Sequence, residues 1–313
     1  MIDITAVGEI LIDLTQSGVN EQGIPVFAAN PGGAPANLAV AASRLGASTA
    51  FIGKVGTDSF GTFLRSTLIE NKVDVSGMVV DQVNRTTLAV VAVDGSGERT
   101  FSFYRDPSAD VKLSVEDIRA EQLKNTKFLH FGSVSLTTDP ARSATLYAAK
   151  TARENGALIS YDPNYRASLW SDEATAIKRM LEPLPMVDVL KVSDEELPLL
   201  TGSSDLEEGS KILADRGITL VLVTLGANGA YYRFGEKTGH VPGTKVKVSD
   251  TNGAGDTFFG AALAQLAKFD RLDAITAEEL EQILAVSNRA AGITTSRHGA
   301  IPAMPIYEEV FGA

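Results

Sequence analysis

Short apolar runs alternate with segments of helical length along most of the chain. Runs that are apolar at every position are typical of parallel strands buried between two layers of helices. The expected strands are Ile4–Val7, Thr49–Ile52, Phe128–Phe131, Leu158–Tyr161, Val187–Val192 and Leu220–Thr224. The expected helices between them are Ala34–Leu45, Phe60–Asn71, Ala141–Asn155 and Leu206–Arg216. This alternation predicts an α/β fold with a parallel sheet covered on both faces.

Two stretches depart from this rhythm. Residues 14–31 are polar, contain glycine and proline, and include a short apolar piece at Pro25–Ala29. Residues 86–104 form two expected strands around a turn at Asp94–Gly97. Because neither stretch has a helix to cover it, together they suit a small β-structured flap over a cleft. No long linker, low-complexity tract or repeat interrupts the chain, so we expect residues 1–313 to form a single domain.

The C-terminal third is predicted to be helical. Gly255–Leu266 is a helix rich in small residues. A second helix begins at Thr276, whose spacing to Glu279 forms a capping box, and runs to about Ile293.

The composition is that of a folded, acidic protein. Hydrophobic residues make up 44% of the 313 residues, enough to bury a sizeable core. The formal net charge of −11 disfavours binding to nucleic-acid phosphate or anionic lipid. The absence of cysteine excludes disulfides and thiolate chemistry. The acidic N-terminus is unlike a signal peptide, and no run approaches the roughly 18 apolar residues of a membrane span, so we expect a soluble, cytoplasmic protein.

The sequence DTNGAGDTFFGA at 250–261 carries the most suggestive chemistry. Gly253, Ala254 and Gly255 are small and stand at the start of a predicted helix, where unpaired amides and the helix dipole attract anions. Asp256 falls in the first turn, where its carboxylate can take a proton from a hydroxyl that attacks a phosphoryl group. A capping role for Asp256 fits the spacing equally well.

A second glycine cluster, Gly32-Gly33, precedes a predicted helix that carries Asn37 in its first turns. It fits either a ligand-binding loop or a tight turn. The P-loop and dinucleotide motifs are absent, as are a zinc-hydrolase motif and a nucleophile elbow, which argues against those enzyme classes.

Together the two glycine-rich segments resemble the signatures of the ribokinase-like (PfkB) carbohydrate kinases. GGAPANLAVAASRLGASTAFIGKVGTDSFG at 32–61 is similar to the N-terminal signature, and 250–261 to the C-terminal one. The segments at 103–110, 161–170, 191–202 and 297–305 look most like those of bacterial fructokinases and 2-keto-3-deoxygluconate kinases. The resemblance covers nearly the whole chain and implies a three-layer α/β/α sandwich with a small β-lid, formed by about 14–31 and 86–104, and a homodimer.

The resemblance also implies residue roles. Asp256 matches the catalytic base, and the amides of Gly253, Ala254 and Gly255 match the anion hole. The positions that match sugar contacts are Asp13, Gly32, Gly33, Asn37, Tyr104, Arg105 and Arg166. Those that match nucleotide contacts are Asn164, Glu196, Thr224, Gly226, Gly229 and Asn288, while Lys191 stands where a phosphate contact would be useful. Those that match a monovalent-cation site are Asp250, Asn252, Thr294, Arg297 and Gly299.

Three positions depart from the family pattern. Ser193 replaces the asparagine of the frequent Asn-x-x-Glu motif, and its Ser-x-x-Glu spacing gives Glu196 an alternative role in a capping box. Asn252 stands within the usual Asp-Thr-Thr-Gly, and Ala303 replaces a common serine beside the expected cation site.

The resemblance therefore predicts an ATP-dependent sugar kinase that uses Mg²⁺, and K⁺ if the cation site is present. The expected product is fructose 6-phosphate. The alternatives are a 2-keto-3-deoxygluconate kinase, a ribokinase, an aminoimidazole riboside kinase, or a sugar-binding sensor without turnover.

Overall fold

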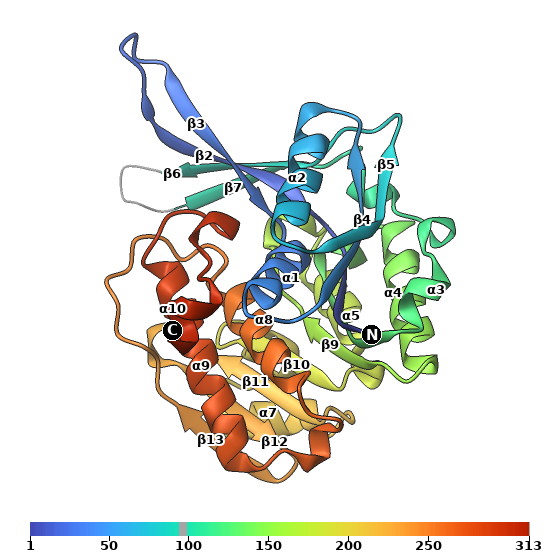
Figure 1. The fold of residues 1–313 in the computed structure, drawn as a ribbon, viewed down its shortest axis with the longest axis vertical. Helices are drawn as coiled ribbons and strands as arrows, with labels where there is room; N and C mark the ends of the chain where they lie inside the picture. The colour runs from blue at the N-terminus through green and yellow to red at the C-terminus, as the bar shows by residue number, and fades with distance from the viewer. Residues whose placement is uncertain (94–98, 313) are drawn as a thin grey trace.

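The computed structural model describes residues 1–93 and 99–312, so the turn expected at Asp94–Gly97 lies outside the described residues. Within that part of the chain, a nine-stranded sheet runs in the order β13-β12-β11-β10-β9-β8-β1-β4-β5 (Figure 1). Neighbours from β11 to β5 are parallel, while β12 and β13 are antiparallel to theirs. The strands are β1 (Ile2–Val7), β4 (Thr49–Gly56), β5 (Asp74–Asp81), β8 (Thr126–Gly132), β9 (Leu158–Asp162), β10 (Val189–Ser193), β11 (Leu220–Thr224), β12 (Ala230–Phe234) and β13 (Lys237–Val241).

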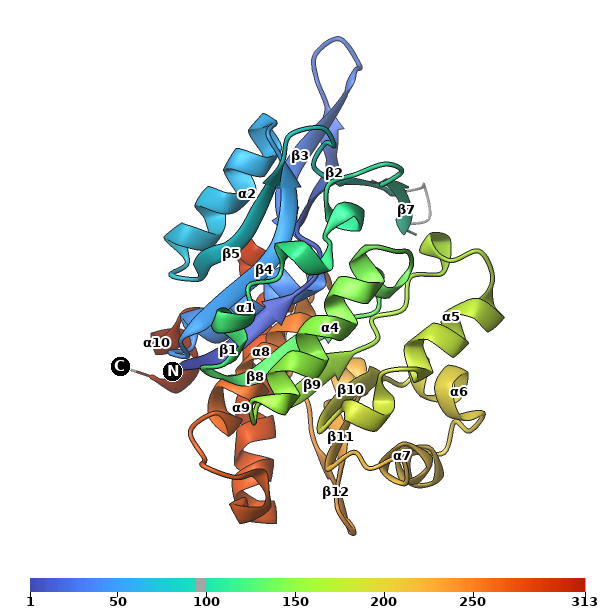
Figure 2. The ribbon, with the colours of Figure 1, turned by 90° about the vertical axis from the view of Figure 1, so that its right-hand side faces the viewer.

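Helices cover both faces of this sheet, as the alternation of strands and helices predicts (Figure 2). One layer contains α3 (Ala120–Leu123), α4 (Ala141–Glu154), α5 (Glu173–Leu181), α6 (Glu196–Thr201) and α7 (Leu206–Ala214). The other contains α1 (Ala34–Arg44), α2 (Ser59–Glu70), α8 (Ala254–Leu266), α9 (Ala277–Thr295) and α10 (Tyr307–Phe311). The capping box expected at Thr276 is present and starts α9.

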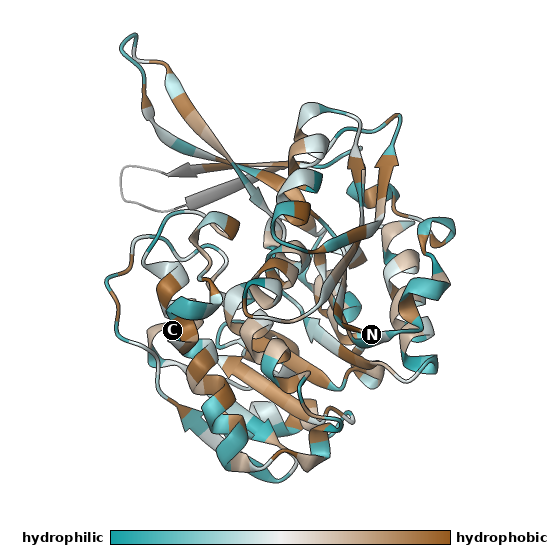
Figure 3. Cartoon of the chain, in the orientation of Figure 1, coloured by the Kyte–Doolittle hydropathy of each residue, from teal (hydrophilic) through white to brown (hydrophobic). Residues whose placement is uncertain are grey.

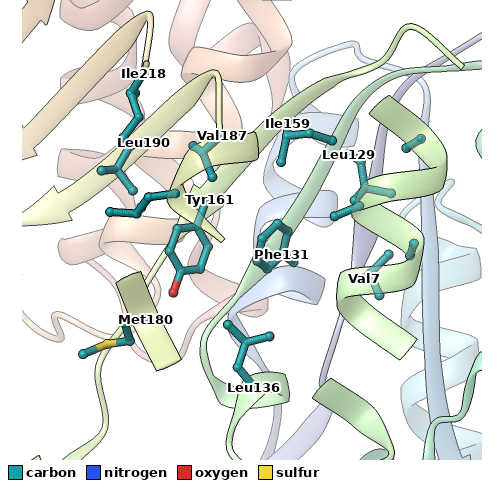
Figure 4. Close-up of a cluster of buried hydrophobic side chains, with 14 of the residues drawn as sticks. Val7, Leu129, Phe131, Leu136, Ile159, Tyr161, Met180, Val187, Leu190 and Ile218 are labelled. Atoms are coloured by element: carbon teal, nitrogen blue, oxygen red, sulfur yellow. The ribbon is translucent and has the colours of Figure 1, made fainter. Parts of the chain in front are cut away.

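Separate hydrophobic clusters fill the two sides of the sheet. Apolar residues concentrate in the strands and in the helix faces turned toward them (Figure 3). Phe131 and Tyr161, on adjacent strands, stack with ring centroids 4.8 Å apart within the cluster beneath α4 and α5 (Figure 4). Strands buried on both faces explain why the expected strands read as continuous apolar runs.

The two stretches that depart from the main rhythm pair into a second sheet. Its order is β3-β2-β6-β7, from β2 (Leu11–Val19), β3 (Pro25–Gly32), β6 (Leu88–Val93) and β7 (Arg99–Tyr104). The β2–β3 hairpin projects away from the body of the molecule (Figure 1). The main and small sheets approach each other at the carboxyl ends of the parallel strands, where α/β folds place their ligands.

No helix in the described part of the chain is both long enough and apolar enough to cross a membrane.

Candidate active site

Helix α8 begins with amides that face open space. Gly253 is its N-cap and has φ 73°, a left-handed conformation that favours glycine. A Cβ at this position would lie 2.9 Å from Ala300 Cβ. Among the described residues, none accepts a hydrogen bond from the amides of Gly253 or Gly255, and the amide of Ala254 has only a long 3.4 Å contact with the carbonyl of Thr251. The helix start is therefore available to an anion.

Asp256 lies in the first turn of α8, at the junction of two hollows. Its side chain is buried, yet it lines both hollows. Asn37 Nδ2 donates to Asp256 Oδ2 at 2.8 Å, and Asn164 Nδ2 lies 3.5 Å from Oδ1. Burial raises the pKa of Asp256, while the hydrogen bond from Asn37 and the charges of Lys191 and Arg166 limit the rise. A buried carboxylate with a raised pKa is suited to act as a general base.

The first hollow, here called the inner cavity, lies between α1, α8 and the small sheet and spans about 480 Å³ when the open solvent at its mouth is included. Its polar lining includes Asp13, Asn37, Asn164 and Arg166. A Cβ on Gly32 would collide with the carboxylate of Asp13, so glycine at this position lets Asp13 reach the cavity. Burial raises the pKa of Asp13 to about 6.

Glu9 also lines the inner cavity, although neither its sequence context nor the family resemblance indicates a site role for it. Its Oε1 accepts the amide of Ala34 at 3.1 Å, which satisfies the start of α1 where Gly33 has no side chain to do so. Its Oε2 is buried and has no hydrogen-bond partner among the residues that the structure describes. Burial raises the pKa of Glu9 to about 7. The carboxylate of Glu9, which lies just before β2, is thus hydrogen-bonded to the start of α1 beside the Gly32-Gly33 turn.

The second hollow, here called the outer cleft, lies at the carboxyl ends of β9, β10 and β11 and spans about 1880 Å³ when the open solvent at its mouth is included. Lys191, Thr224 and Gly226 line it, together with Gly253 and Gly255 at the start of α8. Glu196 lines it too, but its two carboxylate oxygens accept the amides of Tyr165 at 2.6 Å and Ser193 at 2.9 Å. Since Ser193 Oγ also accepts the amide of Glu196, the pair forms a reciprocal capping arrangement.

Six of the residues predicted for catalysis, sugar or nucleotide binding lie outside these two linings. Gly32 and Ala254 are two of them, and each is next in the chain to a lining residue. Tyr104 is exposed, because its neighbour Phe103 takes the face of β7 that lines the inner cavity. Arg105 is buried and donates to Asp110 Oδ2 at 2.7 Å and to Thr137 Oγ1 at 2.7 Å.

Gly229 and Asn288 also lie outside both linings. Gly229 has φ 94° in the turn before β12. The amide of Asn288 donates to the carbonyls of Val241 and Pro242, each at 3.1 Å. Gly229 therefore forms a turn, and Asn288 holds the chain that follows β13, and neither lines the outer cleft.

The segments expected to hold a monovalent cation lie side by side. Asp250 Oδ1 accepts the amide of Asn252 at 2.8 Å, and Oδ2 accepts the amide of Gly299 at 3.0 Å. The hydroxyl of Thr294 is engaged by Thr257, and the guanidinium of Arg297 by Glu309. These two side chains are thus committed elsewhere, whereas the backbone carbonyls of the segments can still serve as oxygen ligands. No cluster of three or more metal-ligating side chains occurs among the described residues.

The fold and the two hollows that meet at Asp256 define a kinase of the ribokinase-like class, and comparison with known proteins assigns the family. The model of the pfkB family carbohydrate kinases matches residues 1–306, and the chain belongs to this family. Probable fructokinase-4 of Arabidopsis thaliana is 43% identical over 310 residues, with 98% of this chain and 95% of the relative covered. Fructokinase-1 of Zea mays is 42% identical over 310 residues, with 98% and 96% covered.

Solved structures agree with this assignment. The fructokinase of Xylella fastidiosa with bound ATP has a TM-score of 0.92 and 34% identity, with 99% of this chain and 97% of that chain covered. The fructokinase of Vibrio cholerae O395 with fructose, ADP and calcium has a TM-score of 0.87 and 38% identity, with 96% and 95% covered. The protein is a carbohydrate kinase with the ribokinase-like α/β fold.

Proposed function

We propose that this protein transfers the γ-phosphate of ATP to the primary hydroxyl of fructose, giving fructose 6-phosphate. The observation that carries the proposal is the place of Asp256, whose carboxylate lines both the inner cavity and the outer cleft beside the open amides of α8. A sugar in the inner cavity and a nucleoside triphosphate in the outer cleft would meet at this carboxylate. Fructokinase relatives that match nearly the whole chain support fructose as the substrate.

The residues suggest how the transfer proceeds. Asp256 takes the proton of the sugar hydroxyl as its oxygen forms a bond to the γ-phosphorus, and the bond from that phosphorus to the bridging oxygen of ADP breaks. The amides of Gly253 and Gly255, with the ammonium of Lys191, stabilise the negative charge on the transferred group. Mg²⁺ bound to ATP would neutralise further phosphate charge, held by phosphates and water, as suits a site without a carboxylate cage.

Charge in the inner cavity favours a neutral sugar. Three carboxylates, those of Glu9, Asp13 and Asp256, line it, and Arg166 is the cationic side chain among its lining residues. Arg105, which could otherwise serve an acidic sugar, is bound to Asp110. A substrate with its own carboxylate, such as 2-keto-3-deoxygluconate, would be repelled more strongly than a neutral polyol.

The small sheet supports two further proposals. Its strand β7 contributes Phe103 to the inner cavity, so we infer that this sheet acts as the lid of a single ribokinase-like domain. The projecting β2–β3 hairpin exposes apolar side chains at Val19, Ile24, Val26 and Phe27. Exposed apolar surface of this kind is suited to a partner, and we propose a homodimer formed through it.

A coupled assay of ADP release tests the substrate. Fructose, 2-keto-3-deoxygluconate, ribose and aminoimidazole riboside are offered at equal concentrations with Mg²⁺ and ATP, and Asp256→Asn serves as the inactive control. We expect the highest kcat/KM with fructose. A higher value with any other sugar would replace fructose as the substrate. Fructose binding without ADP release would instead indicate a sensor.

A further inference from the structure

A buried ion pair lies beneath the outer cleft. Lys191 Nζ lies 2.9 Å from Asp162 Oδ2, and the two side chains are 8% and 3% exposed. Asp162 is the last residue of β9, and Lys191 lies in the adjacent parallel strand β10. A buried ion pair adds little net stability on average, since the cost of removing both charges from water offsets their attraction. Its presence therefore calls for an explanation other than stability.

Lys191 carries its charge to the start of α8. A Cβ on Gly255 would lie 3.1 Å from Lys191 Nζ, so the glycine leaves room for an ammonium beside the open amides. Burial alone would lower the pKa of Lys191, but the carboxylates of Asp162 and Glu196 outweigh this effect and the net shift is upward. A lysine side chain is a point charge on a flexible stem, and Asp162 fixes where that charge lies.

The second oxygen of Asp162 holds a different part of the site. Its Oδ1 accepts the amide of Asn164 at 3.1 Å. Asn164 has φ 46°, in the left-handed region that asparagine tolerates better than most residues. This turn brings Asn164 Nδ2 to 3.5 Å from Asp256 Oδ1 and leads to Arg166, which lines both hollows.

We propose that Asp162 is a positioning residue for phosphoryl transfer. One oxygen holds Lys191 against the start of α8, where it meets the phosphates of a nucleoside triphosphate, and the other holds the Asn164 turn beside Asp256. Asp162 lies in neither the inner-cavity nor the outer-cleft lining, so it acts through these two neighbours. The inference rests on the proposed function only in taking a nucleotide phosphate as the ligand.

A double-mutant cycle separates positioning from folding. Asp162→Asn keeps an oxygen for the Asn164 amide but removes the charge that fixes Lys191. The double variant Asp162→Asn/Lys191→Met also removes the uncompensated buried ammonium, which restores stability. The matched control is Asp81→Asn, because Asp81 is likewise buried at a strand end and its Oδ1 accepts the amides of Val83 at 2.8 Å and Asn84 at 2.9 Å, outside the linings of both hollows.

The cycle has a defined expected result. Lys191→Met should lower kcat/KM for ATP about 10²–10³-fold, the range for losing one preorganised donor. Asp162→Asn should lower it about 10–100-fold, as residues that orient a ligand group do. The double variant should be no worse than Lys191→Met, because the two changes remove the same interaction. Losses that multiply, or an Asp162→Asn variant with parental ATP kinetics, would overturn the proposal, as would an Asp81→Asn variant with the same ATP defect.

The second part of the proposal, that Asp162 holds the Asn164 turn, is tested by a separate measurement. Asp162→Ala removes both oxygens, so it should raise the KM for the sugar above the value for Asp162→Asn. Equal sugar KM values in these two variants would show that Asp162 does not position the Asn164 turn. Fructose specificity is measured separately on the parent, and the cycle uses whichever sugar the parent phosphorylates. Calorimetric measurement of ATP binding without sugar tests the first part, that Asp162 positions Lys191, even if fructose is not the substrate.

Discussion

The two hollows that meet at Asp256 are built from different groups. The inner cavity is small and presents side chains, above all the carboxylates of Glu9 and Asp13 and the amide of Asn37. The outer cleft is larger and presents backbone amides at the start of α8 together with Lys191. Sugar hydroxyls differ in position and need directional side-chain partners, whereas a terminal phosphate is the same in every nucleoside triphosphate and can be held by backbone donors. Changes in the two hollows should therefore affect the two substrates separately.

The largest expected effect lies at the junction, where both substrates are affected together. Asp256→Asn keeps the shape of the side chain but cannot accept the proton, so kcat should fall about 10²–10⁴-fold, the usual contribution of a positioned base. Thermal unfolding of the variant should match or exceed that of the parent, because a buried charge is removed. Steady-state kinetics on the folded variant provide the measurement. Turnover within a few-fold of the parent would mean that Asp256 is not the base.

The acidity of the inner cavity should carry a stability cost that appears with rising pH. Burial raises the pKa of Glu9 from its usual 4.5 to about 7 in the folded protein. The folded state therefore binds this proton more tightly than the unfolded state, and stability falls as pH rises through this window. The shift corresponds to roughly 3 kcal/mol at 1.36 kcal/mol per unit. Glu9→Gln keeps an oxygen for the amide of Ala34 and does not titrate.

We therefore expect the stability of Glu9→Gln relative to the parent to increase by up to roughly 3 kcal/mol between pH 4.5 and pH 8. Urea unfolding at several pH values measures this difference, and any constant effect of the glutamine cancels. Glu70→Gln, on the exposed face of α2, is the matched control. A difference between Glu9→Gln and parent that stays constant with pH would contradict the assignment.

A smaller effect should separate the two hollows cleanly. Asp13→Asn replaces a charged acceptor of the inner cavity, and a hydrogen bond to a charged group contributes about 1.5–3 kcal/mol. The KM for the sugar should rise about 10–100-fold while the KM for ATP stays near the parental value. Initial rates with each substrate varied in turn make the comparison. An equal rise in both KM values would show that the hollows are not independent.

The sequence predicts the centre of this molecule better than its margins. The central strands read correctly because they are apolar on both faces, and α9 begins where the Thr276 capping box places it. The strands β5, β12 and β13 were not expected, since they lie at the sheet's ends, and β5 and β13 carry polar residues. The family resemblance predicts a lid-side sugar contact at Tyr104, but the residue that lines the inner cavity is Phe103, one position earlier. Adjacent side chains of a strand point to opposite faces, so Tyr104 faces away from the cavity.

The residues of the site likewise divide into those that the sequence indicates and those that it does not. Asp13, Asn37 and Asp256 lie in motifs long enough to be recognised, and the structure brings all three into one cavity. The sequence did not indicate Glu9 or the positioning role proposed for Asp162, because both depend on partners distant in the chain. The partner is an amide 25 residues away for Glu9 and Lys191, 29 residues away, for Asp162. A carboxylate at or just beyond the end of a buried strand is the signal that could have indicated both.

The smallest expected effect concerns the monovalent-cation site that the family resemblance predicts beside the outer cleft. Asp250 joins the segment that precedes α8 to Gly299, so an ion held by carbonyls of these segments would stiffen the start of α8 without touching the inner cavity. Replacing K⁺ with tetramethylammonium at constant ionic strength should lower kcat several-fold, because the larger ion cannot enter a ring of carbonyl oxygens, and should leave the KM for the sugar unchanged. Equal rates with both cations would remove the potassium site. A change confined to the sugar KM would place the ion in the inner cavity instead, against the division between the two hollows.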